Sequence, residues 1–125
     1  MGQPAWFDWL LRQPIYIPCK SKVVHPNQPW DCASGFGSLH SSAVAEGALD
    51  TKSKELIALG IAIAVHCDGC IAFHVHDALN AGATRQQTME AIGVAILMGG
   101  GPSMVYGCEA MEALNEFEKE QNLPV

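Results

Sequence analysis

Two cysteines and a histidine stand close together in the middle of the chain, in the segment CDGCIAFH at 67–74. On an α-helix Cys70 would lie about 60°, and His74 about 20°, from Cys67 around the axis. Cys70 and His74 also form an i,i+4 pair, the separation at which helical side chains meet. A histidine there can take the thiol proton and leave a reactive thiolate. A second thiol, with two residues between it and the first, can close a disulfide. The segment therefore predicts redox chemistry at sulfur.

A carboxylate precedes this segment, because eleven residues separate Glu55 from Cys67. Glu55 opens the apolar run 56–65, so it is either solvated at a helix end or aimed at a partner. If the run is a helix that folds back beside the cysteine helix, Glu55 can orient His74 and raise its basicity, as the third group of a triad does. Spacing alone leaves both alternatives open.

The full pattern E-x11-C-x-x-C-x3-H resembles the signature of the alkylhydroperoxidase D-like branch of the carboxymuconolactone decarboxylase family. The similarity extends through GALD at 47–50, ALNAGAT at 78–84 and MGGGPS at 98–103, and it covers roughly residues 35–120. The resemblance implies an all-helical, obligately oligomeric protein. It also implies that the cysteine pair reduces hydroperoxides or exchanges disulfides.

The same resemblance assigns a role to each matched residue. Cys70 is similar to the thiol that attacks the peroxide, and Cys67 to the resolving thiol that faces the external reductant. His74 and Glu55 are similar to the proton relay. The macrodipole of a helix would favour Cys67 as the thiol of lower pKa, whereas the pairing with His74 favours Cys70. We follow the resemblance and expect Cys70 to attack.

One position departs from the family pattern. The best-known members carry a second histidine directly before the second cysteine, where this chain has Gly69. His66, directly before Cys67, is the candidate relay residue in its place. His40 has no partner that the sequence reveals, and we expect Cys108 to be a small core residue.

The cycle that the resemblance implies needs a small-molecule hydroperoxide and an external dithiol, either a lipoyl group or a thioredoxin-like protein. It needs no bound cofactor and no metal. Two alternatives within the resemblance are a general disulfide reductase without peroxidase activity and a lactone decarboxylase-like lyase. Because the lactone decarboxylases typically lack the cysteine pair, its presence argues against the lyase.

A zinc site is the main alternative outside the family. Cys67, Cys70 and His74, with His66 or His76, supply four potential ligands. All of them crowd one helix and its start, which makes a tetrahedral site within one chain hard to close. We therefore expect redox chemistry rather than metal binding at these residues.

The elements that must position these residues are helices. We expect a short helix over 4–12, a proline-rich arm that completes residues 1–33, and a helical domain over 34–125. Within the domain, 34–48 is weakly helical, and Asp50 is a candidate N-cap for a helix to about His66. Further helices are predicted over 68–80, from the Thr84–Gln87 capping box to about 98, and from 102 or 103 to about 121. The fold class is thus all-α, with five or six helices.

Composition limits the partners. A chain of 125 residues is one domain by length, and its net charge of −6 without a basic block argues against nucleic acid. Charged residues make up 16%, against about 25% in ordinary domains, which leaves apolar surface for subunit contacts. We expect a homotrimer or homohexamer. Without a secretory signal or an apolar run of membrane-spanning length, we expect a cytoplasmic location away from the membrane.

Overall fold

The computed structural model describes residues 31–121, and within this range the chain forms five helices and no strand. The helices are α2 (Asp31–Val44), α3 (Thr51–Ala64), α4 (Asp68–Asn80), α5 (Arg85–Gly99) and α6 (Gly101–Gln121). The predicted all-α class is therefore confirmed. The expected helix over 4–12 and the proline-rich arm up to residue 30 lie outside the described residues.

Two of the helices begin at the caps that the sequence predicts. The Asp50 carboxylate accepts a hydrogen bond of 2.7 Å from the backbone N–H of Ser53 at the start of α3. This bond to the ionised form lowers the pKa of Asp50. At the start of α5, Thr84 Oγ1 accepts from the N–H of Gln87, and Gln87 Oε1 accepts from the N–H of Thr84. This reciprocal pair is the capping box, and it satisfies two backbone donors that the helix itself leaves unpaired.

α3 and α4 end in the same kind of turn. After α4, Gly82 has a φ of 89°, and the N–H of Ala83 donates to the carbonyl of Ala78. After α3, His66 occupies the equivalent place with a φ of 62°, and the N–H of Cys67 donates to the carbonyl of Ala62. This pattern is the Schellman motif, whose left-handed residue is usually glycine. The His66 turn reverses the chain within three residues and so brings α4 back along α3.

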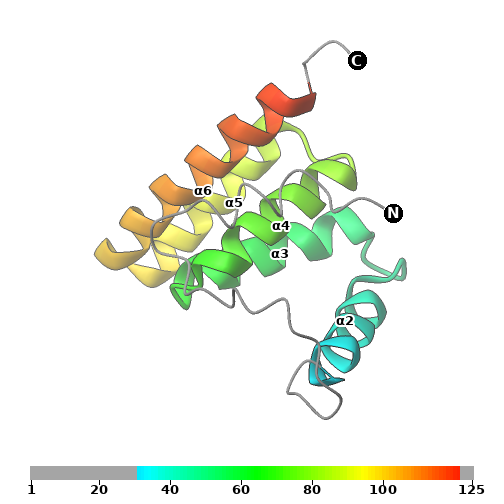
Figure 1. The fold of residues 1–125 in the computed structure, drawn as a ribbon. Coiled ribbons are helices and arrows are strands. Elements are labelled where there is room, and N and C mark those ends of the chain that lie inside the picture. Colours follow the sequence, from blue (N-terminus) through cyan, green and yellow to red (C-terminus); the bar gives the residue numbers. More distant parts are fainter. Residues whose placement is uncertain (1–30, 122–125) are drawn as a thin grey trace.

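α3 to α6 form the bundle, and α2 stands apart from it at one end (Figure 1). α3 packs against both α4 and α5, and α6 lies across α4 and α5. Large side chains with at most 4% exposure fill the space between the four helices; they are Leu59, Ile63, Ile71, Val75, Ile92, Leu114 and Phe117. The bundle therefore holds the ends of α3 and α4 rigidly side by side.

The predicted bounds of α2 and α3 and the predicted burial of Cys108 need correction. α2 begins at Asp31 and ends at Val44, rather than spanning 34–48, and α3 ends at Ala64, two residues before the predicted end. Cys108 was expected in the core, but its thiol is free and exposed. In α6 the neighbouring positions Gly107 and Ala110 face the core, so Cys108 falls on the other side of the helix.

One side of the bundle presents an apolar groove between α3 and α5. Its lining comes from both helices: Leu56, Ile57, Gly60, Ile61, Ala64, Ala91, Val94, Ala95 and Met98. Several of these side chains are more than half exposed, and Met98 reaches 78%. We call this surface the apolar face. None of the described helices combines the length and hydropathy that crossing a membrane would require.

Candidate active site

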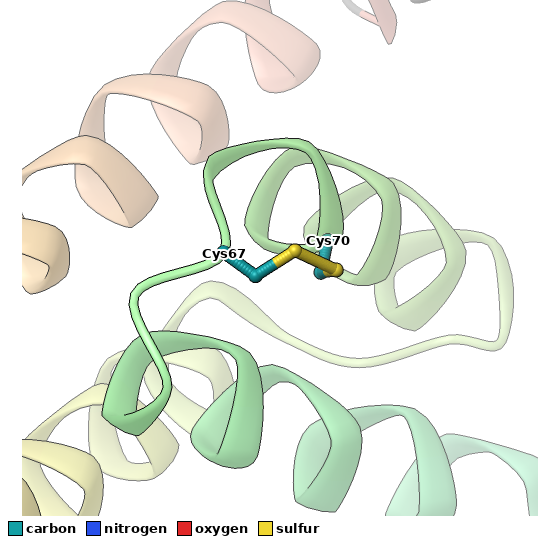
Figure 2. Close-up of a disulfide and its surroundings, with 2 residues drawn as sticks. All are labelled: Cys67 and Cys70. Atoms are coloured by element: carbon teal, nitrogen blue, oxygen red, sulfur yellow. A yellow bond between two sulfur atoms is a disulfide. The ribbon is translucent and has the colours of Figure 1, made fainter.

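The two cysteines lie at the start of α4 and are joined by a disulfide (Figure 2). Cys67 is the N-cap residue, with an extended backbone, and Cys70 lies in the first turn of the helix. Their Cα atoms are 5.2 Å apart, within the usual range for a disulfide. Cys70 packs against the hydrophobic core, and both cysteines are partly exposed. The local fold thus accommodates a disulfide between the N-cap and the first turn of α4.

Glu55 meets His74 inside the bundle. Nδ1 of His74 lies 2.7 Å from Oε2 of Glu55, so the imidazole donates to the carboxylate. Glu55 is only 1% exposed, although it is a charged residue in the first turns of α3. The alternative of a solvated carboxylate at a helix end is therefore wrong. With its proton on Nδ1, His74 keeps a lone pair on Nε2 that can accept a proton.

A second histidine lies on the same carboxylate. Nε2 of His40, from α2, is 3.2 Å from Oε1 of Glu55. The His40 ring also meets Phe73 edge-on at 4.9 Å and lies 5.7 Å from the ring of His74. Sequence reasoning missed His40 because its segment has only a weak helical pattern. No signal in the sequence pairs His40 with Glu55, because the contact depends on how α2 lies against α3.

The other histidines near the cysteines have different neighbours. The ring of His66 stacks on Tyr106 of α6 at 4.5 Å, with 9° between the planes. His76 is hydrogen-bonded to Asp77 through Nδ1 and lies against Asn80. In the described chain the residue that joins the Glu55–His74 pair is therefore His40, whereas the ring of His66 stacks on Tyr106.

The surroundings of Cys67 are acidic. Asp68 follows Cys67 in the first turn of α4, where its charge offsets the positive end of the helix dipole. Burial, and then the neighbouring carboxylate of Asp68, raise the pKa of Glu109 on α6. The Asp68 carboxylate opposes a further negative charge at the adjacent Cys67. The advantage that the helix terminus would give to a Cys67 thiolate is thereby reduced.

Taken together, the geometry offers a thiol pair at the N-terminus of α4 and an oriented base one turn further on. Cys70 and His74 are four residues apart on this helix, so they share a face. Glu55 fixes the tautomer and the orientation of His74 from the adjacent helix. Such an arrangement can ionise a thiol and carry its proton away. The four-ligand zinc arrangement considered above is not assembled among the described residues, since its cysteines are bonded to each other and His66 and His76 face other partners.

Comparison with known proteins places this geometry in a family. Residues 31–113 match the model of the carboxymuconolactone decarboxylase family. A protein of Cupriavidus necator is 40% identical over 85 residues, which are 66% of this chain and 75% of that protein. Uncharacterised protein 4 of the cox locus of Paracoccus denitrificans is 40% identical over 83 residues, again 66% and 75% of the two chains.

Solved structures agree with these sequence matches. An apo structure of a carboxymuconolactone decarboxylase family protein from Legionella pneumophila is 48% identical, with a TM-score of 0.66, over 70% of this chain and 78% of that one. A family protein from Thermotoga maritima, a candidate participant in an antioxidative response, is 29% identical, with a TM-score of 0.67, over 72% and 93% of the two chains. The chain therefore belongs to the carboxymuconolactone decarboxylase family, and its C-x-x-C pair is consistent with the alkylhydroperoxidase D-like branch.

Proposed function

We propose that this protein is a thiol-dependent hydroperoxide reductase. The observation that carries the proposal is the buried contact of 2.7 Å between Glu55 and His74, one helical turn from Cys70. A buried carboxylate beside an imidazole is the arrangement that makes histidine an effective base. Family membership and the antioxidative association of the Thermotoga relative support the same chemistry.

In the proposed cycle, His74 takes the proton of Cys70 and Glu55 stabilises the imidazolium that forms. The Cys70 thiolate attacks the distal oxygen of a hydroperoxide. The O–O bond breaks, the alkoxide leaves with the proton from His74 as an alcohol, and sulfur is oxidised to the sulfenic acid. The thiol of Cys67 then displaces hydroxide from this sulfur, which releases water and closes the disulfide. An external dithiol reduces the disulfide and becomes a disulfide itself.

The surroundings of both cysteines support Cys70 as the attacking thiol. Cys70 shares a helix face with His74, and it packs against the core, where a small hydroperoxide with an apolar group can be desolvated. Cys67 is the N-cap beside the acidic Asp68, which disfavours a thiolate there. We therefore assign Cys67 as the resolving thiol, which a lipoyl group or a thioredoxin-like protein reduces. Because the pair must be reset by such a dithiol, we place the protein in the reducing cytoplasm.

The apolar face supports assembly of identical chains. Its exposed side chains lie on α3 and α5, and Phe36 and Leu39 on α2 are also exposed, at 71% and 62%. Apolar surface of this kind is normally covered by a partner. We propose that a second copy of the chain covers it, in a homotrimer or homohexamer.

Variants of single cysteines test the function. Purified protein is supplied with dihydrolipoamide and an organic hydroperoxide, and peroxide consumption is followed. We expect Cys70→Ser to abolish turnover, and Cys67→Ser to allow one rapid reaction that leaves a trappable sulfenic acid on Cys70. Cys108→Ser, which removes an exposed thiol remote from the pair in sequence, is the matched control and should turn over normally. Full turnover by Cys70→Ser would reject the proposal.

The same variants separate the alternatives. A general disulfide reductase would reduce small disulfides with dihydrolipoamide through the Cys67–Cys70 pair and leave peroxide unconsumed. A lactone decarboxylase-like lyase would act on its substrate equally well after replacement of both cysteines.

A further inference from the structure

Three helices bring two imidazoles and one carboxylate to a single point. His40 from α2, Glu55 from α3 and His74 from α4 each offer one donor atom, and these three atoms lie within 4.8 Å of one another. Glu55 is buried, and the His40 and His74 side chains are only 21% and 17% exposed. The cluster is thus a largely enclosed set of nitrogen and oxygen donors that contains no sulfur.

The two donor pairs that share Glu55 lie near the spacing of metal ligands, and all three donor atoms lie within 4.8 Å of one another. Zn²⁺ binds imidazole nitrogen and carboxylate oxygen at about 2.0–2.2 Å, so two ligands in a tetrahedral site lie about 3.3 Å apart. Nε2 of His40 and Oε1 of Glu55 are 3.2 Å apart. Nδ1 of His74 is closer to Oε2 of Glu55, at 2.7 Å, because a proton joins them. Loss of that proton and a separation of about half an ångström would convert this pair to the spacing of a bound metal.

His40 supplies an independent sign that a group is missing. Its Nε2 is fully buried and has no hydrogen-bond partner within residues 31–121, because the nearby Oε1 of Glu55 lies off the direction in which the ring nitrogen can bond. A buried polar atom without a partner is costly, and such atoms in native proteins usually have an ion or a water. The ring is held in this place by its edge-on contact with Phe73. A cation among the three side chains would complete the bonding of His40.

We propose that His40, Glu55 and His74 bind a divalent transition-metal ion of the zinc class. Two imidazoles and one carboxylate are a donor set for Zn²⁺, Co²⁺ or Fe²⁺ that leaves coordination positions open for water or a ligand. The cysteines are not part of this site. It therefore differs in every ligand but His74 from the zinc arrangement that the sequence offers.

Metal binding at these residues also gives the protein a means of regulation, and this part rests on the proposed function. Coordination at Nδ1 of His74 leaves the ring proton on Nε2, so His74 can no longer accept the proton of the Cys70 thiol. The metal also occupies the Glu55 carboxylate that would stabilise the imidazolium. The metal-loaded protein is then a poor peroxidase, and removal of the metal restores it. Proton relay and metal site are alternative states of the same three side chains.

The binding experiment uses Co²⁺ as the probe, because its visible spectrum reports coordination number and ligand type. Reduced, metal-free protein is titrated with Co²⁺, and the absorption and the stoichiometry are measured. We expect one Co²⁺ per chain with a four- or five-coordinate spectrum that lacks the thiolate-to-cobalt band. The Cys67→Ser/Cys70→Ser double variant should bind equally well.

Histidine variants locate the ion. His40→Ala should weaken Co²⁺ binding more than about 100-fold, since loss of even an outer partner of a ligand costs 10- to 100-fold. His40→Gln, which preserves size and polarity, repeats the test if circular dichroism shows that the alanine variant is unfolded. His76→Ala is the matched control, because His76 lies on the same helix as His74 but is bonded to Asp77. Three results would overturn the proposed site. They are the absence of saturable Co²⁺ binding, binding by both His40 variants that is as tight as in the unchanged protein, and loss of binding in the cysteine double variant.

Peroxide consumption by the metal-free protein is measured separately, so that the two proposals can fail independently. Co²⁺ binding without peroxidase activity would support the metal site and reject the proposed function. Peroxidase activity without Co²⁺ binding would support the function and reject the metal site. Where both are present, we expect saturating Zn²⁺ to slow peroxide consumption more than tenfold and a chelator to reverse this. An unchanged rate at full occupancy would overturn the regulatory part.

Discussion

Glu55→Gln is the substitution that probes the relay most selectively. It keeps the size of the side chain and an oxygen that can accept from Nδ1 of His74, but it removes the charge. A hydrogen bond to a charged group contributes about 1.5–3 kcal/mol and a neutral one about 0.5–1.5 kcal/mol, so the imidazolium of His74 loses about 1–1.5 kcal/mol of stabilisation. Since about 1.4 kcal/mol corresponds to a factor of ten, we expect the reaction of Cys70 with peroxide to slow roughly tenfold. His74→Asn removes the base itself and should cost about 10²–10⁴ in rate.

The rate is measured by stopped-flow mixing of reduced, metal-free protein with an organic hydroperoxide. Stability is followed in parallel by denaturant unfolding, because removal of one charged partner from a buried pair can itself destabilise the fold. Glu46→Gln is the matched control, since Glu46 is an exposed carboxylate that accepts from Thr51 at the start of the same helix. A Glu55→Gln variant that reacts within twofold of wild type, while His74→Asn is slow, would show that the carboxylate has no part in the reaction.

Three further predictions concern the fold, its electrostatics and its assembly. Gly99→Ala should destabilise the chain by about 1–3 kcal/mol, because the new Cβ would lie 1.8 Å from Oγ and 2.8 Å from Cβ of Ser103. Gly93→Ala in the same helix meets no atom within 4 Å and should instead stabilise by up to about 1 kcal/mol in urea unfolding. Because the pKa of Glu109 is raised, its carboxyl holds a proton more tightly in the folded than in the unfolded state, favouring folding at low pH and opposing it as pH rises past the folded pKa. Glu109→Gln should therefore raise the Tm at pH 7 and leave it nearly unchanged near pH 4, where a persistent difference would contradict the assignment. Met98→Lys puts a charge on the apolar face and should lower the sedimentation coefficient to that of a smaller species, whereas an unaltered assembly would place the subunit contacts elsewhere.

Local signals made much of the fold predictable. Two helix starts were predictable at Asp50 and Thr84, because these side chains accept hydrogen bonds from backbone N–H groups. A helix end was predictable at Gly82, because glycine readily adopts the positive φ of the turn. The contact between Glu55 and His74 could be stated as a hypothesis, because a helix that folds back along the preceding one brings its later residues near the start of that helix. The sequence could not decide it, since a carboxylate at the head of an apolar run also fits a solvated helix end.

Other parts of the site depend on interactions that no local pattern reports. His40 reaches Glu55 from α2, a helix that makes few contacts with the bundle and whose polar, glycine-containing sequence gives no clear face. His66 was a relay candidate by its place beside Cys67, but a left-handed φ in the turn directs its ring to Tyr106. Both results depend on long-range packing and on the direction of a single backbone turn, and spacing along the chain encodes neither.

The central claim is that the cysteine pair reduces hydroperoxides, and a single-turnover experiment tests it most directly. Fully reduced, metal-free protein receives one equivalent of an organic hydroperoxide, and the loss of peroxide and the state of each cysteine are determined by mass spectrometry. The account predicts rapid stoichiometric loss of peroxide, one equivalent of alcohol and a disulfide between Cys67 and Cys70. Unreacted peroxide with both thiols intact would contradict it.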